Sequence, residues 1–235
     1  MTLVTERATR LSVSEMLKVG EMGSIKKGKA PLETLREIQK VVFVGSSCAG
    51  KSTIEKAVRV AALADSRLRE LVSIPKRVVT RNPRPDDEDM SYCTAEDFQR
   101  KLEAGDLGLY GVKIMERGRL EPYGYSQPRK GTLPIYFANN QTIRNSSSLL
   151  PQDFLEGALT GVIYAPDHVR ETRMRTRSPQ LFIEKPDEVA FRLSAEERSV
   201  RLAMETHLIV RNFGRFQAST SNDVIELIRH LSGAT

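Results

Sequence analysis

The segment that most constrains the fold is glycine-rich residues 45–52 (GSSCAGKS). It follows a continuous apolar run at residues 41–44, which is typical of a strand buried on both faces. Residues 51–64 then carry apolar side chains at helical spacing. A strand that turns into a helix across two glycines can aim several backbone N–H groups at one anion, and the helix N-terminus adds partial positive charge. The segment therefore predicts a phosphate-binding loop, which we call the 45–52 loop.

The 45–52 loop matches the pattern GxxxxGK[ST] at every required position, so we expect ATP and Mg²⁺ as cofactors. In such loops the lysine, here Lys51, reaches the β- and γ-phosphates, and the hydroxyl of Ser52 ligates Mg²⁺. We interpret Cys48 as a small filler residue and not as a reactive thiol. The residues expected to hold the phosphates of ATP are Ser46, Ser47, Cys48, Ala49, Gly50, Lys51, Ser52 and Thr53.

Length and composition describe an ordinary globular protein. The chain has 235 residues, of which 40% are hydrophobic and 28% charged, and this excludes collagen-like, mucin-like and wholly disordered chains. No apolar run is long enough to cross a bilayer, and the N-terminus lacks the apolar stretch of a secretory signal. With only two cysteines, Cys48 and Cys93, we expect a cytoplasmic protein without a disulfide framework.

The net charge of +6 favours an anionic partner: a nucleic acid, an acidic membrane or a phosphorylated small molecule. The cations cluster at residues 76–84 and 170–177, which suggests pockets or lids more than a nucleic-acid stripe. We expect a small phosphorylated acceptor as the partner, not a membrane or a nucleic acid, and a monomer or homodimer. A solvated helix face and a nucleic-acid surface are the alternatives for the arginine-rich residues 170–177.

Buried strands alternate with helices along the chain, which predicts an α/β fold with a parallel sheet and helices on both faces. We expect residues 1–37 to be an N-terminal extension, residues 38–235 the main domain, and residues 81–131 an inserted subdomain. The expected strands are residues 41–44, 77–80, 107–115, 120–125, 134–138, 159–165 and 207–210. The expected helices are residues 51–64, 94–103, 167–177, 186–206 and 221–231.

A second anion site is indicated directly after the expected core strand 77–80. Arg81 and Arg84 lie three residues apart across a proline, so both can point at one anion, and the planar guanidinium gives bidentate contacts to phosphate. Tyr92 follows eight residues later and could add a hydroxyl. The alternative is that both arginines are solvated at the surface. The phosphate-binding loop upstream favours the anion site over this alternative, because a kinase needs a site for its acceptor.

The order of these motifs resembles the guanylate kinase family. The 45–52 loop, the TRNPR segment at residues 80–84, Tyr92 and the pair Tyr123-Gly124 follow one another as in that family. Residues 189–195 (VAFRLSA) resemble its late helix, and residues 207–212 (HLIVRN) resemble its last strand. The likeness runs from about residue 40 to 232 and implies a P-loop kinase with a core sheet flanked by helices, an acceptor-binding insert at 81–131 and a mobile lid at 171–186.

The resemblance also implies residue roles. The acceptor phosphate would be held by Arg81, Arg84, Tyr92 and Tyr123. The transferring phosphoryl group would be neutralised by Lys51, by Arg192 and by lid arginines from among Arg173, Arg175 and Arg177, of which we select Arg173 and Arg177. Asn212 would lie near the base of the donor nucleotide. The implied activity is ATP- and Mg²⁺-dependent phosphoryl transfer to GMP or a related nucleotide.

Three positions depart from the family pattern. The strand at residues 107–111 lacks the glutamate with which guanylate kinases read guanine, Tyr125 replaces a small hydroxyl residue, and Asn139-Asn140 replace an aspartate. A strand followed by Asn is closer to the ribose 1,5-bisphosphate phosphokinases, so a phospho-sugar kinase is one alternative. A non-catalytic guanylate kinase-like binding module is another, against which the intact Gly50-Lys51-Ser52 argues. A nucleic-acid-stimulated ATPase is the third.

Overall fold

The computed structural model describes residues 23–30, 32, 35, 37–83, 90–114, 120–138, 155–194 and 206–234. The strands in this part of the chain are β1 (Ile25–Lys27), β2 (Lys40–Gly45), β3 (Val72–Ser73), β4 (Arg77–Val79), β5 (Met90–Tyr92), β6 (Leu107–Ile114), β7 (Leu120–Ser126), β8 (Leu133–Phe137), β9 (Ala158–Tyr164) and β10 (Leu208–Arg211). The helices are α2 (Lys51–Ala64), α3 (Ser66–Leu71), α4 (Ala95–Glu103), α6 (Asp167–Arg177), α7 (Pro179–Glu184), α8 (Pro186–Leu193), the 3₁₀ turn η4 (Gly214–Phe216) and α10 (Thr220–Ser232).

The core is a six-stranded sheet in the order β1-β10-β9-β2-β8-β3. All neighbouring pairs are parallel except β1 with β10. Strand β2 lies in the middle, and its Val41 is opposite both Ile135 of β8 and Leu159 of β9. The expectation of an α/β fold with a mostly parallel sheet is confirmed.

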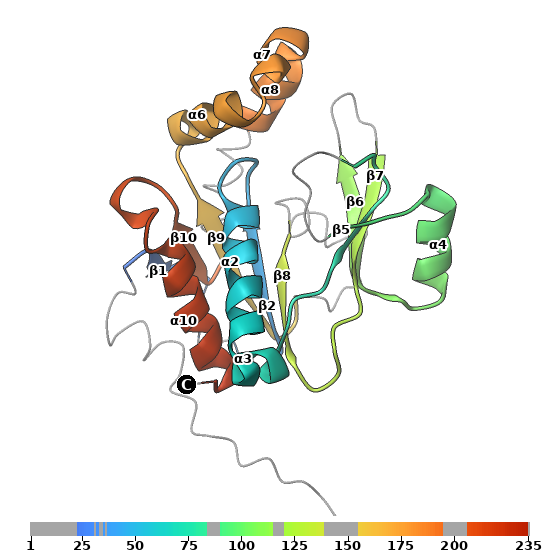
Figure 1. Ribbon diagram of the computed structural model, residues 1–235, viewed down its shortest axis with the longest axis vertical. Coiled ribbons are helices and arrows are strands. Elements are labelled where there is room, and N and C mark those ends of the chain that lie inside the picture. The colour runs from blue at the N-terminus through green and yellow to red at the C-terminus, as the bar shows by residue number, and fades with distance from the viewer. Residues whose placement is uncertain are drawn as a thin grey trace, which may run out of the picture.

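Side chains of β2 alternate between two hydrophobic clusters, as the period of a strand requires. Val41 and Phe43 belong to a cluster that includes residues of α2 and α10, and Figure 1 shows these helices and α3 in front of the sheet. Val42 and Val44 belong to the other cluster, which includes Tyr125 of β7.

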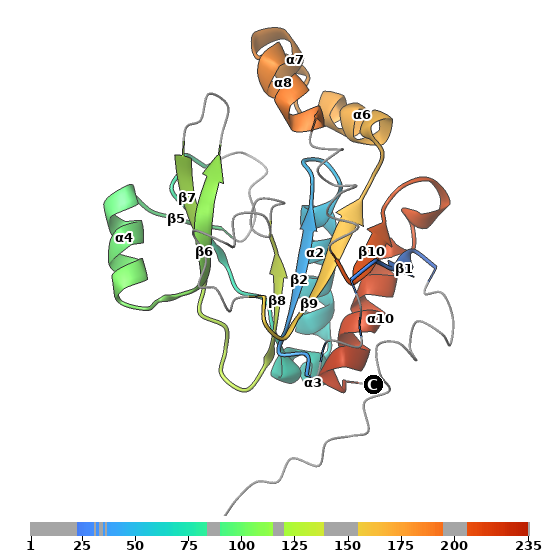
Figure 2. The same cartoon turned by 180° about the vertical axis from the view of Figure 1, so that it is seen from behind.

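Helices were expected on both faces of the sheet, and the described residues place them on one. On the second face the described strands β2, β8 and β9 face the viewer in Figure 2, and the apolar cluster there is completed by residues of β6 and β7. Leu109 and Tyr125 are buried in that cluster, with 2% of each exposed. A second sheet thus takes part of the place that we assigned to helices.

The second sheet has four strands in the order β5-β4-β7-β6. It contains residues 77–79, which we expected in the core sheet, so that assignment was wrong. Arg77 pairs in register with Tyr125 of β7 and with Met90 of β5, and the place beside β8 in the core sheet is taken by β3. Helix α4 is part of this region, and Figure 1 shows it at the edge away from α2.

Several element ends follow the local signals in the sequence. The hydroxyl of Thr94 accepts a hydrogen bond from the N–H of Asp97 at 3.0 Å and caps α4 as expected. A helix was expected from residue 186 to 206, but α8 ends at Leu193 with Ser194 as its C-cap. The expected break after α6 is present, because Ser178 leaves the helical conformation before Pro179 begins α7.

Part of the expected N-terminal extension belongs to the core. Strand β1 pairs with β10 at the edge of the six-stranded sheet, whereas residues 1–22 lie outside the described residues. Gly28 follows β1, and its N–H donates to the carbonyl oxygen of His207 at 2.7 Å. A Cβ at Gly28 would lie 2.1 Å from the carbonyl oxygen of Thr206, so this close approach requires glycine. In the part of the chain that the structure describes, no helix combines the length and the apolar character needed to span a bilayer.

The hydroxyl of Tyr125 connects the two sheets, and its removal should lower stability. The Tyr125 hydroxyl donates to the carbonyl oxygen of Phe137 in β8 at 2.7 Å, and burial raises the pKa of Tyr125, so the hydroxyl stays protonated. Tyr125→Phe should lower the free energy of unfolding by about 1–2 kcal/mol because the buried carbonyl loses its partner. Urea unfolding measures this. Tyr110→Phe, on the same sheet, is the control and should change stability by less than about 0.5 kcal/mol.

Candidate functional site

The 45–52 loop connects the end of β2 to the start of α2. Cys48 has φ +60° and Gly50 has φ +101°, both in the left-handed region. A Cβ at Gly50 would lie 1.9 Å from the side-chain nitrogen of Asn212, and one at Gly45 would lie 2.7 Å from the carbonyl oxygen of Ile163. Both glycines are therefore required by close contacts, and at Gly50 also by the backbone conformation.

The N-terminus of α2 is suited to an anion. Its N-cap, Gly50, provides no side-chain hydrogen bond, and the first turn contains no acidic residue. The first N–H groups of a helix have no partner within the helix, and the helix dipole favours negative charge there. The ammonium of Lys51 folds back over the loop and donates to the carbonyl oxygens of Gly45 and of Ser46, the latter at 2.9 Å.

The carbonyl groups on the loop point to donors from the C-terminal half of the chain. The oxygen of Ser47 accepts from Arg170 Nε at 3.0 Å, and the oxygen of Cys48 accepts from Arg173 Nη1 at 3.2 Å. The oxygen of Ala49 accepts from Asn212 Nδ2 at 2.7 Å. Three consecutive carbonyls are thus held by side chains more than 120 residues away in sequence, which fixes the turn of the loop.

Arg170 is a structural residue. Only 1% of it is exposed, and its guanidinium also donates to the carbonyl oxygens of Arg192 and Leu193, at 2.5 and 3.3 Å, and to the carboxylate of Asp167 at 2.6 Å. It therefore joins the end of α8 to the start of α6 and to the 45–52 loop. In the sequence Arg170 is one of several arginines within residues 170–177. No neighbouring residue in the sequence indicates that it is buried.

Arg173, which we expected to be catalytic, lies against the loop. Its Nη2 donates to the carbonyl oxygen of Asn212 at 2.8 Å, and a Cβ at Gly50 would be 3.7 Å from its Nη1. Partial burial lowers the pKa of Arg173 from its ordinary value. Asn212, expected near the donor base, is buried, and its amide bonds to the loop carbonyl of Ala49.

The other two arginines expected in catalysis lie farther along the same segment, where Figure 1 shows α7 and α8 beyond α6. Arg192 forms an ion pair with Glu188 one turn earlier in α8. Arg177 is exposed at the end of α6. Arg175, also on α6, pairs with Glu171 and lies 4.1 Å over the ring of Phe182 in α7. The catalytic roles of Arg177 and Arg192 stay predictions.

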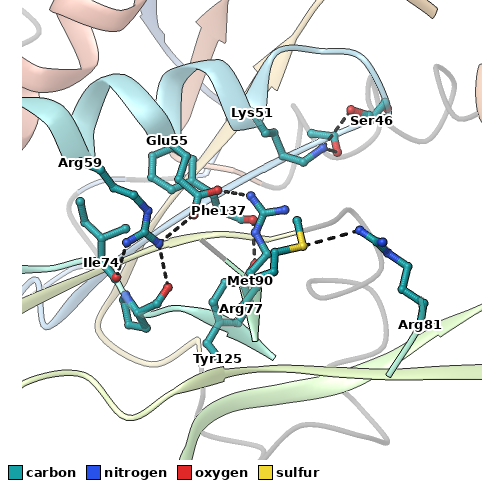
Figure 3. Close-up of polar contacts among 12 residues, drawn as sticks. Ser46, Lys51, Glu55, Arg59, Ile74, Arg77, Arg81, Met90, Tyr125 and Phe137 are labelled. Carbon is teal, nitrogen blue, oxygen red and sulfur yellow. Dashed lines mark hydrogen bonds and ion pairs between the residues drawn. The ribbon is translucent and has the colours of Figure 1, made fainter. Parts of the chain in front are cut away.

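Three of the four residues expected to bind the acceptor, Arg81, Tyr92 and Tyr123, lie on the second sheet or just after one of its strands. The guanidinium of Arg81 donates to the carbonyl oxygen of Asn82 at 2.8 Å and lies 3.5 Å from the sulfur of Met90 (Figure 3). Tyr92 ends β5 with 36% of it exposed, and Tyr123 in β7 is buried at 8%. Arg84 and Asn139-Asn140 lie outside the described residues.

A buried polar cluster that the sequence did not reveal connects the two regions. Glu55 of α2 is 6% exposed and forms ion pairs with Arg59 and with Arg77 of β4 (Figure 3). Arg59 follows Glu55 by one helical turn, so that pair was detectable from spacing. The partners Glu55 and Arg77 are 22 residues apart in the sequence, so no local spacing pattern predicts their ion pair.

A bound Mg²⁺ would find a hydroxyl ligand at the start of α2. Ser52 is exposed in its first turn, as is Thr53. Within the described ranges, no group of three or more His, Cys, Asp or Glu side chains could hold a metal ion. The Ser52 hydroxyl fits a Mg²⁺ ion held mainly by substrate phosphates and waters, which is usual for this ion.

Comparison with known proteins finds similarity to solved structures. No protein-family model matches the chain, and no curated protein matches it. The guanylate kinase from Anaplasma phagocytophilum is 18% identical, with a TM-score of 0.46 over 82% of this chain and 86% of that chain. The function proposed for this chain therefore rests on its own residues and contacts.

The buried role of Arg170 predicts unequal effects of two substitutions on one helix. Arg170→Met should lower the free energy of unfolding by about 2–3 kcal/mol because it leaves carbonyls of the loop and of α8 without a donor. Arg175→Met removes an arginine whose side chain is 60% exposed and should cost less than about 1 kcal/mol. Thermal or urea unfolding measures both. Equal losses would contradict the structural role of Arg170.

Proposed function

We propose that this protein is a P-loop phosphotransferase that moves the γ-phosphoryl group of ATP, with Mg²⁺, to a small phosphorylated acceptor. GMP or a related nucleotide is the leading acceptor. The observation that carries the proposal is the 45–52 loop: a GxxxxGKS sequence between a central parallel strand and a helix whose N-terminus carries no capping side chain.

On the donor side, the loop would bind the ATP phosphates through its backbone N–H groups. Residues 46–53 form this cradle, and the Lys51 ammonium would exchange its carbonyl partners for phosphate oxygens. Mg²⁺, ligated by Ser52, would neutralise charge on the β- and γ-phosphates when bound. Arg173, already at the loop, would add positive charge there, with Arg177 and Arg192 contributing when the proposed lid, residues 171–186, closes.

On the acceptor side, arginine guanidinium groups would bind the phosphate of the acceptor. Arg81 lies two residues after β4, and Arg84 follows it across a proline. Tyr92 of β5 and Tyr123 of β7 would complete the set of residues that hold the acceptor phosphate. In such reactions the protein mainly positions two phosphates and neutralises their charge, and the proposed division between two phosphate sites suits that task.

A phospho-sugar such as ribose 1,5-bisphosphate is the second candidate acceptor. The sequence of β6 favours this candidate, because residues 107–111 include no carboxylate that could hydrogen-bond to guanine. A binding module without activity is a further candidate, and the complete GKS sequence argues against it.

An acceptor panel tests the proposal. ADP release would be followed with Mg²⁺-ATP and, separately, GMP, dGMP, AMP, other nucleoside monophosphates and ribose 1,5-bisphosphate. At least one acceptor should stimulate ADP release well above the rate with ATP alone. Failure of every acceptor would contradict the proposed transfer. Tight ATP binding together with hydrolysis stimulated by DNA or RNA would instead indicate a nucleic-acid-dependent ATPase.

Substitution of the loop lysine should abolish turnover and leave the fold intact. Lys51→Met removes the ammonium but keeps an apolar stem, so kcat should fall by at least about 10²-fold. Lys56→Met, an exposed lysine on the same helix, is the matched control and should retain nearly full activity. Steady-state kinetics on the stimulating acceptor measures kcat, and circular dichroism checks folding. Nearly full activity of Lys51→Met would contradict its role.

A further inference from the structure

A buried polar cluster of Glu55, Arg59 and Arg77 connects α2 to β4. None of these residues has a role in the proposed phosphoryl transfer. Glu55 lies one helical turn after Lys51 on α2 and is 6% exposed. A buried carboxylate is costly unless it is paired and hydrogen-bonded. Both of its oxygens are used: Oε1 accepts from Arg59 Nη2 at 3.0 Å, and Oε2 accepts from Arg77 Nη2.

Arg59 extends the cluster to the backbone. Its Nη1 donates to the carbonyl oxygen of Ile74 at 2.9 Å, and its Nη2 donates to that of Pro75 at 3.1 Å (Figure 3). Together with the Glu55–Arg77 pair, these bonds attach residues 74–77 to α2. Here the chain leaves the core sheet after β3 and begins the second sheet with β4.

The cluster therefore spans the two proposed phosphate sites. One end is α2, which begins with Lys51, and the other end is β4, after which Arg81 follows by two residues. Figure 3 shows Lys51 and Arg81 both to the right of the Glu55–Arg77 pair, with Lys51 above and Arg81 below, beyond Met90. The side chains of the pair are 9% and 19% exposed, so solvent screens it less than an ion pair at the surface. Because desolvation offsets much of the Coulomb attraction in such pairs, its main effect is on geometry, not on stability.

We propose that Glu55 is a positioning residue that, through Arg59 and Arg77, holds the acceptor-binding sheet in place relative to the phosphate-loop helix. This rests on the proposed function for its kinetic consequence, since in-line transfer needs both phosphates at a fixed separation. Loss of these contacts of Glu55, which we call the tether, leaves the ATP site intact. Arg81 is then no longer held at a fixed distance from Lys51. The effect therefore falls on the acceptor KM, and not on ATP binding.

The kinetic test uses three variants and one matched control. Glu55→Gln keeps the shape and removes the charge, Arg77→Gln removes the partner, and the double variant removes both. Each should raise the acceptor KM by about tenfold with the ATP Kd unchanged within about twofold, and the double variant should be no worse than either single one. Glu226→Gln, which breaks an exposed pair with Arg229 on α10, should change neither constant. Arg77→Lys, which keeps the cation, should recover most of the acceptor affinity.

Two kinetic outcomes would overturn the proposal. One is an unchanged acceptor KM in both single variants. The other is a loss that raises the ATP Kd and the acceptor KM alike and adds up in the double variant, because that pattern indicates general destabilisation.

Hydrogen–deuterium exchange of the full-length protein tests the tether without activity. Backbone amides of residues 74–79 should exchange at least about fivefold faster in Glu55→Gln, whereas those of β10 should not change. Unchanged exchange at residues 74–79 would overturn the tether, whatever the kinetics show. If the unmodified protein shows no acceptor-dependent turnover, the proposed function fails, and the exchange result still decides whether Glu55 holds β4.

Discussion

The conformation of the 45–52 loop is the constraint on which the other features depend. A loop that turns its N–H groups to one side must turn carbonyl groups to the other, and buried carbonyls need donors. Here the donors are Arg170, Arg173 and Asn212, which come from α6 and from the residue after β10. The turn of the loop is therefore held by side chains from the C-terminal half of the chain.

The structure divides the polar contacts around this loop into two groups. On one side, Arg170 connects the α6–α8 segment to the loop. On the other, Glu55 connects α2 to the start of β4, and the Tyr125 hydroxyl connects β7 to β8. Both proposed substrate sites are thus attached to the unit formed by β2, the 45–52 loop and α2. In the proposed phosphoryl transfer the protein mainly positions the two substrates, and this common attachment would fix their relative position.

Local signals in the sequence predicted what is local in the structure. The run at residues 41–44, the glycines of the loop and the helical spacing after it identified β2 and α2, and Thr94 identified the start of α4. Membership of a sheet is a long-range property, so residues 77–79 were recognised as a strand and assigned to the wrong sheet. Likewise, nothing in the spacing separates Arg170, which is buried, from the exposed Arg175, because only the tertiary fold gives it carbonyl partners.

The central claim is that the amides of the 45–52 loop hold the phosphates of a nucleoside triphosphate. Backbone amide resonances of ¹⁵N-labelled protein, followed while Mg²⁺-ATP is added, test it directly. Saturable shifts should be largest at residues 46–53 in the unmodified protein and much weaker in Lys51→Met. Saturable binding whose shifts leave residues 46–53 unmoved, or no binding at millimolar ATP, would contradict it.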